Sequence, residues 1–195
     1  KNIHIEAASM KVDDMYIHAK EKTHLTAVID STLTQSHVKK DGFLSSTSRS
    51  DMKLTQSVKG TEIETANLSV EGEKEATLES IRVNATNSAE IISKTGNVNF
   101  TAKSYTNARY HEESDSMLGG LISSRAVDEV SKTLLADSSA SAESQIILAG
   151  KNINLVATNL ETSNGDIKLS ASENINIVSG MESQSITHIR EESGI

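Results

Sequence analysis

The sequence predicts an all-β protein, and within that class a parallel β-helix, on three observations. A five-residue phrase recurs six times: an apolar residue, any residue, a second apolar residue, any residue, then Ala. Large rings are scarce, with 2 Phe, 3 Tyr and no Trp in 195 residues, so the interior must be aliphatic and thin. Proline is absent, which suits extended strands whose N–H groups are all needed for pairing.

The phrase has the period of a strand. Its six copies occupy residues 3–7, 15–19, 81–85, 98–102, 153–157 and 167–171. Successive side chains of a strand point to opposite faces, so the apolar members point inward and the polar members outward. A single copy cannot bury its apolar face alone. Many near-identical copies at short intervals therefore predict that each copy stacks on its neighbour.

Turn residues separate the copies. The glycines between them are Gly60, Gly72, Gly96, Gly150 and Gly165. Glycine tolerates positive φ, so we expect these positions to let the chain bend between consecutive strands. An antiparallel β-sandwich could use the same turns. The return of one phrase with a small inward Ala favours the parallel arrangement.

A longer period is superimposed on the phrase. His37, His111 and His188 each precede a charged stretch and then a Gly followed by an apolar residue, and they lie 74 and 77 residues apart. We therefore expect residues 1–195 to be a single β-helix segment of a longer repeat protein, with repeat units near 1–41, 61–116 and 144–195. The first phrase begins at once, so we expect targeting signals to lie outside this segment.

Two connecting excursions are expected between the units. Residues 42–60 are rich in Ser, Thr and Lys, and predict a hairpin or a loop. Residues 117–143 contain apolar Val127, Val130, Leu134 and Leu135 at i, i+3, i+7 and i+8. That spacing is typical of a helix, and it predicts a short one near 126–136.

The charge excludes one class of partner. Lys and Arg number 19 against 27 Asp and Glu, for a net charge of -8. No basic stripe interrupts this balance, and rings for base stacking are few, so no nucleic acid is expected as a partner. Cysteine is absent, which removes disulfides, thiolate metal sites and Cys nucleophiles.

Histidines on the phrase raise the question of a metal site. His4 and His18 occupy the same outward position of two copies, and His24 follows six residues later. Stacking could bring such side chains within ligand distance. Outward positions of repeats are nonetheless simply filled by polar residues, so we expect no metal and no cofactor.

Adjacent carboxylates raise the question of acid–base catalysis. The pairs are Asp13-Asp14, Glu112-Glu113 and Glu191-Glu192. Neighbouring residues of a strand point to opposite faces, and aromatic residues that would bind sugar are few. No phosphate-binding loop, nucleophile elbow or HExxH motif is present either. We therefore expect solvated charges and no catalytic residues.

One apolar run stands apart from the phrases. It contains Met117, Leu118, Leu121 and Ile122 around two glycines. These residues are either a connector packed on the stacked strands or a contact for a partner or a membrane.

The phrases and the longer period resemble a known family. Residues 149–161, AGKNINLVATNLE, followed by GDIKLSA at 165–171, are similar to the haemagglutinin repeats of large two-partner-secretion exoproteins. The sequence HVKKDGFLSS at 37–46 looks like their recurring KKSGLxSS element. The resemblance covers essentially the whole chain and is clearest in residues 144–195, whereas the insertion near 125–143 departs from the family's shorter connectors.

Filamentous haemagglutinin adhesins and contact-dependent growth inhibition exoproteins carry such repeats. The resemblance implies a right-handed parallel β-helix, exported through an outer-membrane partner transporter and displayed on the surface of a Gram-negative cell. It implies a structural and adhesive stalk without catalysis, in contact with a target cell or its outer membrane. Exposed ladder edges add the expectation of end-to-end self-association. The alternative is a β-helix polysaccharide lyase or glycoside hydrolase.

Overall fold

Strands make up almost all regular structure of this chain. The computed structural model describes residues 1–194, and over that range it contains no α-helix, so the predicted all-β class is confirmed. The shorter strands are β1 (Ile3–Glu6), β2 (Ser9–Lys11), β3 (Asp14–Ala19), β4 (Lys22–Thr26), β8 (Glu75–Glu79), β10 (Asn97–Thr101), β13 (Ser138–Ala142) and β15 (Thr158–Thr162). The longer ones are β5 (Val28–Gly42), β6 (Ser45–Lys59), β7 (Thr61–Gly72), β9 (Ile81–Ser93), β11 (Lys103–Met117), β12 (Ile122–Ala136), β14 (Gln145–Val156), β16 (Asp166–Val178) and β17 (Ser183–Ser193). A single 3₁₀ turn, η1 (Leu118–Gly120), lies between β11 and β12.

The chain divides into two compact units, each built from three separate segments. Unit 1 comprises residues 1–29, 58–104 and 135–181. Unit 2 comprises residues 30–57, 105–134 and 182–195, of which residue 195 lies outside the described range. The sequence-based excursions at 42–60 and 117–143 fall on the later parts of the first two unit 2 segments and run on into unit 1.

Unit 1 consists of three series of parallel strands. The first series is β1, β4, β8, β10 and the C-terminal halves of β14 and β16. The second is β2, the N-terminal halves of β7 and β9, β13 and β15. The third is β3, the C-terminal halves of β7 and β9, and the N-terminal halves of β14 and β16. The chain passes through the three series in this order repeatedly.

The register of these series places like residues above one another. In the first series Val98 pairs with Ile153, which pairs with Ile175. Val98 and Ile153 are fully buried, whereas Ile175, in the last strand of its series, is 46% exposed. Inner strands therefore hide their apolar members between two neighbours, as the alternation predicts.

The corner glycines act through close approach of backbone. A Cβ at Gly96 would lie 1.6 Å from the carbonyl oxygen of Lys74, and one at Gly165 would lie 1.5 Å from that of Ser144. Among the described glycines only Gly119 and Gly120 have positive φ. The expectation that the corner glycines are needed for positive φ is therefore wrong, because they are needed for space against the preceding pass of the chain.

Another corner, between the first and second series, is made in two ways. On three passes a residue with left-handed φ turns the chain directly: Ala7 at 45°, Ser80 at 48° and Ala157 at 48°. On the two passes between them, the chain continues past Ala27 or Ala102 into the long strands β5 or β11. The segments of unit 2 therefore always leave at one corner, on every second pass.

Asparagine columns reinforce the outer side of the first series. One column is Asn97, Asn152 and Asn174, and the other is Asn99, Asn154 and Asn176. In each step the amide of the later strand donates to the amide oxygen of the earlier one, over 3.0, 2.9, 2.8 and 2.8 Å. Parallel in-register strands bring identical amides to this spacing.

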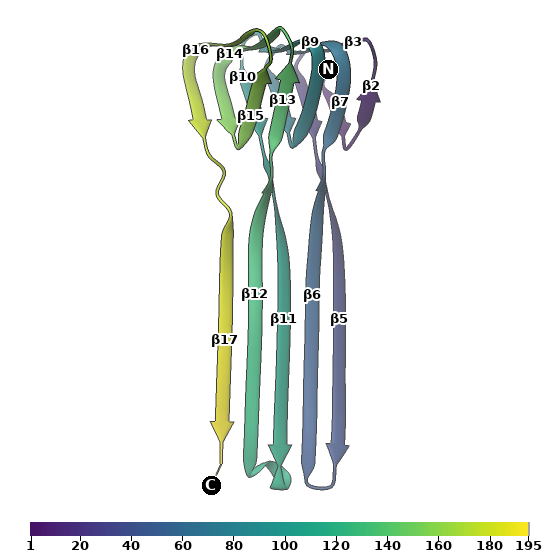
Figure 1. The fold of residues 1–195 in the computed structure, drawn as a ribbon, viewed down its shortest axis with the longest axis vertical. Helices are drawn as coiled ribbons and strands as arrows, with labels where there is room; N and C mark the ends of the chain where they lie inside the picture. The colour runs from purple at the N-terminus through teal and green to yellow at the C-terminus, as the bar shows by residue number, and fades with distance from the viewer. Residues whose placement is uncertain (195) are drawn as a thin grey trace. The chain divides into compact units, whose positions relative to one another are not determined.

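Unit 2 is a five-stranded antiparallel sheet in the order β17-β12-β11-β6-β5 (Figure 1). Two hairpins, β5–β6 and β11–β12, lie side by side because β11 pairs with β6, and β17 then adds to β12. Of its described residues only Val127 is fully buried, so most side chains of this sheet remain open to solvent.

The predicted helix near 126–136 is wrong, because these residues lie in strand β12. In the antiparallel register Val127 faces Ile189 and Val130 faces Ile186. Cross-strand pairs of β-branched residues stabilise a sheet, and they outweigh a helical spacing that a single segment shows by itself.

Replacing Phe100 with Ala should destabilise unit 1 by about 3–5 kcal/mol, because this ring is fully buried and its removal leaves a cavity. Urea unfolding followed by circular dichroism measures the change. Tyr16→Ala, at a side chain that is 76% exposed, is the control and should stay within about 0.5 kcal/mol of the parent. Equal losses in the two variants would refute the assigned core.

Replacing Asn154 with Ala should destabilise unit 1 by about 1–2 kcal/mol, because this middle amide bonds to both Asn99 and Asn176. Asn176→Ala removes only the amide bond to Asn154 and should cost roughly half as much. The same unfolding measurement compares them, and a larger loss for Asn176→Ala would contradict the column.

Candidate functional site

The turns of the two hairpins gather exposed apolar side chains at one end of the unit 2 sheet. The β5–β6 turn supplies Phe43 and Leu44, and the segment around η1 supplies Met117, Leu118, Leu121 and Ile122. Their exposed fractions run from 45% to 95%. The backbone N–H of Gly119 donates to the carbonyl oxygen of Leu44 over 3.5 Å, so the turns touch. We call these six residues the tip surface.

Backbone strain accompanies the tip surface. Leu44 has φ 63° and Leu118 has φ 54°, a conformation that bulky residues rarely adopt. Glycine or asparagine would satisfy either turn at lower cost. Strained positions of this kind cluster at functional sites, so the two leucines mark the tip surface as a candidate for binding.

The sequence identified only part of this surface. Met117, Leu118, Leu121 and Ile122 were expected either to pack on the stacked strands or to contact a partner or a membrane. All four side chains are 45–57% exposed. Sequence reasoning missed Phe43 and Leu44. The available signal was the match of residues 43–46, FLSS, with residues 121–124, LISS, which places the two segments at equivalent turns.

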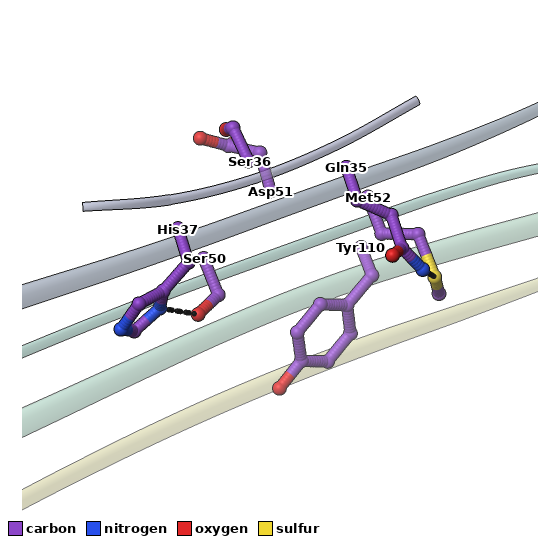
Figure 2. A pocket seen from close by; sticks show the side chains of 7 residues that line it. All are labelled: Gln35, Ser36, His37, Ser50, Asp51, Met52 and Tyr110. Carbon is purple, nitrogen blue, oxygen red and sulfur yellow. Dashed lines mark hydrogen bonds between the residues drawn. The ribbon is translucent and has the colours of Figure 1, made fainter. Parts of the chain in front are cut away.

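A second candidate is an open pocket of about 390 Å³ on the unit 2 sheet. It is lined by Gln35, Ser36 and His37 of β5, Ser50, Asp51 and Met52 of β6, and Tyr110 of β11 (Figure 2). The Nδ1 atom of His37 lies 2.8 Å from the hydroxyl oxygen of Ser50. Figure 2 shows the rings of His37 and Tyr110 on one side of the sheet.

The serine, histidine and aspartate of this pocket do not form a catalytic triad. Figure 2 shows Asp51 pointing to the other side of the strands from His37 and Ser50. Alternation along β6 requires this, because Ser50 and Asp51 are neighbours in one strand. The Asp51 carboxylate instead lies 2.7 Å from Nδ1 of His111. His37 therefore lacks the acid that would orient it as a base.

Two His–Asp pairs join neighbouring strands of unit 2. His111 on β11 lies opposite Asp51 on β6, and His188 on β17 lies opposite Asp128 on β12. The Nδ1 to Oδ1 distance of the second pair is 2.6 Å. The recurring histidines of the sequence therefore mark one strand of each unit 2 segment.

Arginines complete these pairs. The hydrogen bond from the Arg49 guanidinium lowers the pKa of the Asp51 carboxyl below its ordinary value, and the bond from His111 adds to this effect. His188, and then Arg190, lower the pKa of the Asp128 carboxyl in the same way. Hydrogen bonds to the charged form of a carboxyl favour that form.

The histidines of unit 1 do not assemble a metal site. His4 stacks edge to face with His24, with ring centroids 6.3 Å apart. His18 lies in the third series, where Nδ1 approaches Glu71 within 3.3 Å. Over residues 1–194 no group of three or more His, Asp or Glu side chains is arranged to hold a metal ion.

The adjacent carboxylates are engaged in ordinary polar contacts. Asp14 accepts a hydrogen bond from Asn67 over 2.8 Å. Glu112 accepts from Tyr110 over 2.5 Å and from Arg125 over 2.7 Å. Arg125 also reaches Glu191 at 3.2 Å. One carboxylate of each pair is therefore engaged by a neighbouring Asn, Tyr or Arg, which suits solvated faces.

Comparisons with known proteins add no relative. No family model, curated protein or solved structure matches this chain. In the described part of the chain no helix has the length and apolar character needed to cross a bilayer.

The His–Asp pairs predict acid sensitivity of unit 2. Each carboxyl has a folded-state pKa below the unfolded value of about 3.9. The pairs therefore stabilise the sheet above that pH, and this stabilisation is lost as the pH falls through the folded-state pKa. In the double variant Asp51→Asn, Asp128→Asn, stability should change less between about pH 6 and pH 3 than in the parent.

Urea unfolding at a series of pH values measures this dependence, with amide hydrogen exchange to assign it to unit 2. Asp115→Asn, in the same sheet, is the matched control and should keep the parent's pH profile. An unchanged profile in the double variant would show that the pairs do not contribute.

Proposed function

We propose that this chain is a structural and adhesive stalk segment of a secreted filamentous exoprotein with haemagglutinin repeats. Unit 1 is then the stalk, a right-handed parallel β-helix, and the segments of unit 2 are insertions in its sequence. One observation supports this above others: the three parallel series keep one register while the chain passes through them repeatedly. Thr61 and Ile81, 20 residues apart, are register partners, and so are Val98 and Ile153, 55 residues apart.

The chemistry of the described residues supports a role without catalysis. The serine and histidine of the pocket lack an acid on their own side, and one member of each carboxylate pair is bonded to Asn, Tyr or Arg. A stacked aliphatic interior covered by repeated polar side chains is suited to form an extended support that displays other segments, and it does not enclose a substrate.

The resemblance supplies the cellular setting of this proposal. Export proceeds through an outer-membrane partner transporter, and display is on the surface of a Gram-negative cell. A growth-inhibition exoprotein that helps deliver a toxin to a target cell fits the same repeats. The absence of cysteine is compatible with a chain that is exported unfolded, because no disulfide can form too early.

The tip surface is the part of unit 2 that we assign to contact with a target cell's outer membrane. Six apolar side chains from two touching turns form one exposed patch. Aromatic and aliphatic side chains on short turns can enter the headgroup region of a bilayer while the strands behind them stay in water.

The strands at the ends of the unit 1 series support the expected self-association. Strand β16 closes the first and third series, and its Ile167, Ile175, Ile177 and Val178 are 42–69% exposed. Open parallel edges with apolar side chains are templates for further strands.

The double variant Leu121→Asp, Ile122→Asp should lose binding to intact Gram-negative cells and to vesicles of outer-membrane lipid. Burial of each apolar side chain is worth about 1.5–3 kcal/mol, so the loss should be about tenfold or more. Flow cytometry with the labelled chain and vesicle flotation measure it.

The matched control is Leu33→Asp, on strand β5, where the side chain is 56% exposed but lies outside the tip surface. It should bind as the parent does, and strand content by circular dichroism should be equal in all three proteins. Unchanged cell and vesicle binding by the double variant would refute the role of the tip surface.

A further inference from the structure

The pocket on β5, β6 and β11 combines one fixed aromatic ring with several polar side chains. Tyr110 lies opposite Met52 in the antiparallel register, so the ring stands against the thioether. Its hydroxyl donates to Glu112 over 2.5 Å, and Arg125 holds the same carboxylate at 2.7 Å. These bonds hold the hydroxyl end of the side chain, and Tyr110 lines the pocket (Figure 2).

The polar groups around the ring are only partly occupied by one another. His37 uses Nδ1 toward Ser50, and its second ring nitrogen points away from that hydroxyl (Figure 2). The Gln35 amide donates over 3.4 Å to the sulfur of Met52, a weak acceptor. The amide oxygen and the second N–H group of Gln35 remain suited to bond with a ligand.

The carboxylate among the residues that line the pocket lies on the other side of this part of the sheet. Glu112, bonded to the Tyr110 hydroxyl, and Arg125 do not line the pocket. Asp51 points away from the ring and pairs with His111 and Arg49. The groups on the side of Tyr110 that line the pocket are therefore an amide, an imidazole, a hydroxyl, a thioether and a phenol ring. Such a set offers little to an anion or a cation and much to a neutral molecule rich in hydroxyl groups.

We infer that this pocket binds a neutral oligosaccharide, with one sugar ring stacked on Tyr110 and its hydroxyl groups bonded to His37 and Gln35. The negative face of an aromatic ring attracts the polarised C–H groups of a sugar. The volume of about 390 Å³ matches one or two sugar units in an open groove. The inference rests on the proposed adhesive function, since it names a glycan as a second ligand of the same surface unit.

Saturation-transfer NMR of the whole chain tests this with three defined probes: cellohexaose, maltohexaose and chitohexaose. At least one should receive saturation on its ring protons, and a competition series gives its affinity. Tyr110→Ala should weaken that affinity about tenfold, because the stacking face is removed. Tyr110→Phe keeps the face and should change it by less than about threefold.

His37→Ala and Gln35→Ala should each weaken binding by about threefold to tenfold, as expected for a lost hydrogen bond. Tyr16→Ala, at an exposed tyrosine of unit 1, is the matched control and should have no effect. Amide spectra confirm that the unit 2 sheet persists in every variant.

Absence of saturation transfer to all three probes, or equal binding by Tyr110→Ala and the parent, would overturn the inference. Tip-dependent binding to cells would then stand by itself, because Leu121 and Ile122 lie outside the pocket. Conversely, glycan binding that persists while cell and vesicle binding fail would refute the membrane contact and leave the pocket assigned.

Discussion

In-register stacking of parallel strands is the constraint on which unit 1 depends. A strand of five residues buries only two or three side chains, and Val98 and Phe100 are hidden only because Ala76 and Leu78 lie on one side of them and Ile153 and Leu155 on the other. A slip of one residue would turn each of these strands inside out. Asparagine columns, glycine corners and left-handed turns all serve to keep that register.

Much of unit 1 could be predicted from sequence, because the information is local and repeated. The alternation in residues 98–102 or 153–157 fixes which side chains are buried, and glycines mark the corners. The reason why these corners need glycine could not be predicted from sequence. The atom that leaves no room for a side chain at Gly96 is the carbonyl oxygen of Lys74, which belongs to another pass of the chain. The path of the chain after Ala7 and Ala27 could not be predicted either. These two residues are equivalent in the repeat, but a tight turn follows at Ala7 and the long strand β5 follows Ala27.

Unit 2 was harder to predict for a physical reason. Its strands have few buried side chains, so hydrophobic alternation is weak, and the apolar spacing from Val127 to Leu135 fits a helix as well as a strand. What selects the strand is pairing with β17, about 60 residues later in the chain. The periodic histidines were visible, but their partners Asp51 and Asp128 are separated from them by whole strands, which a linear pattern does not reveal.

The corner at Ala7, Ser80 and Ala157 shows how such a protein can grow. The same corner accepts a one-residue turn or a detour of some thirty residues, and the strands on either side keep their partners in both cases. Foreign peptides grafted after Ser80 or Ala157 should therefore be tolerated as additional detours. The chain offers a scaffold for displaying sequences at regular intervals. The backbone fixes the spacing, and the sequence of the inserted peptide is free to vary.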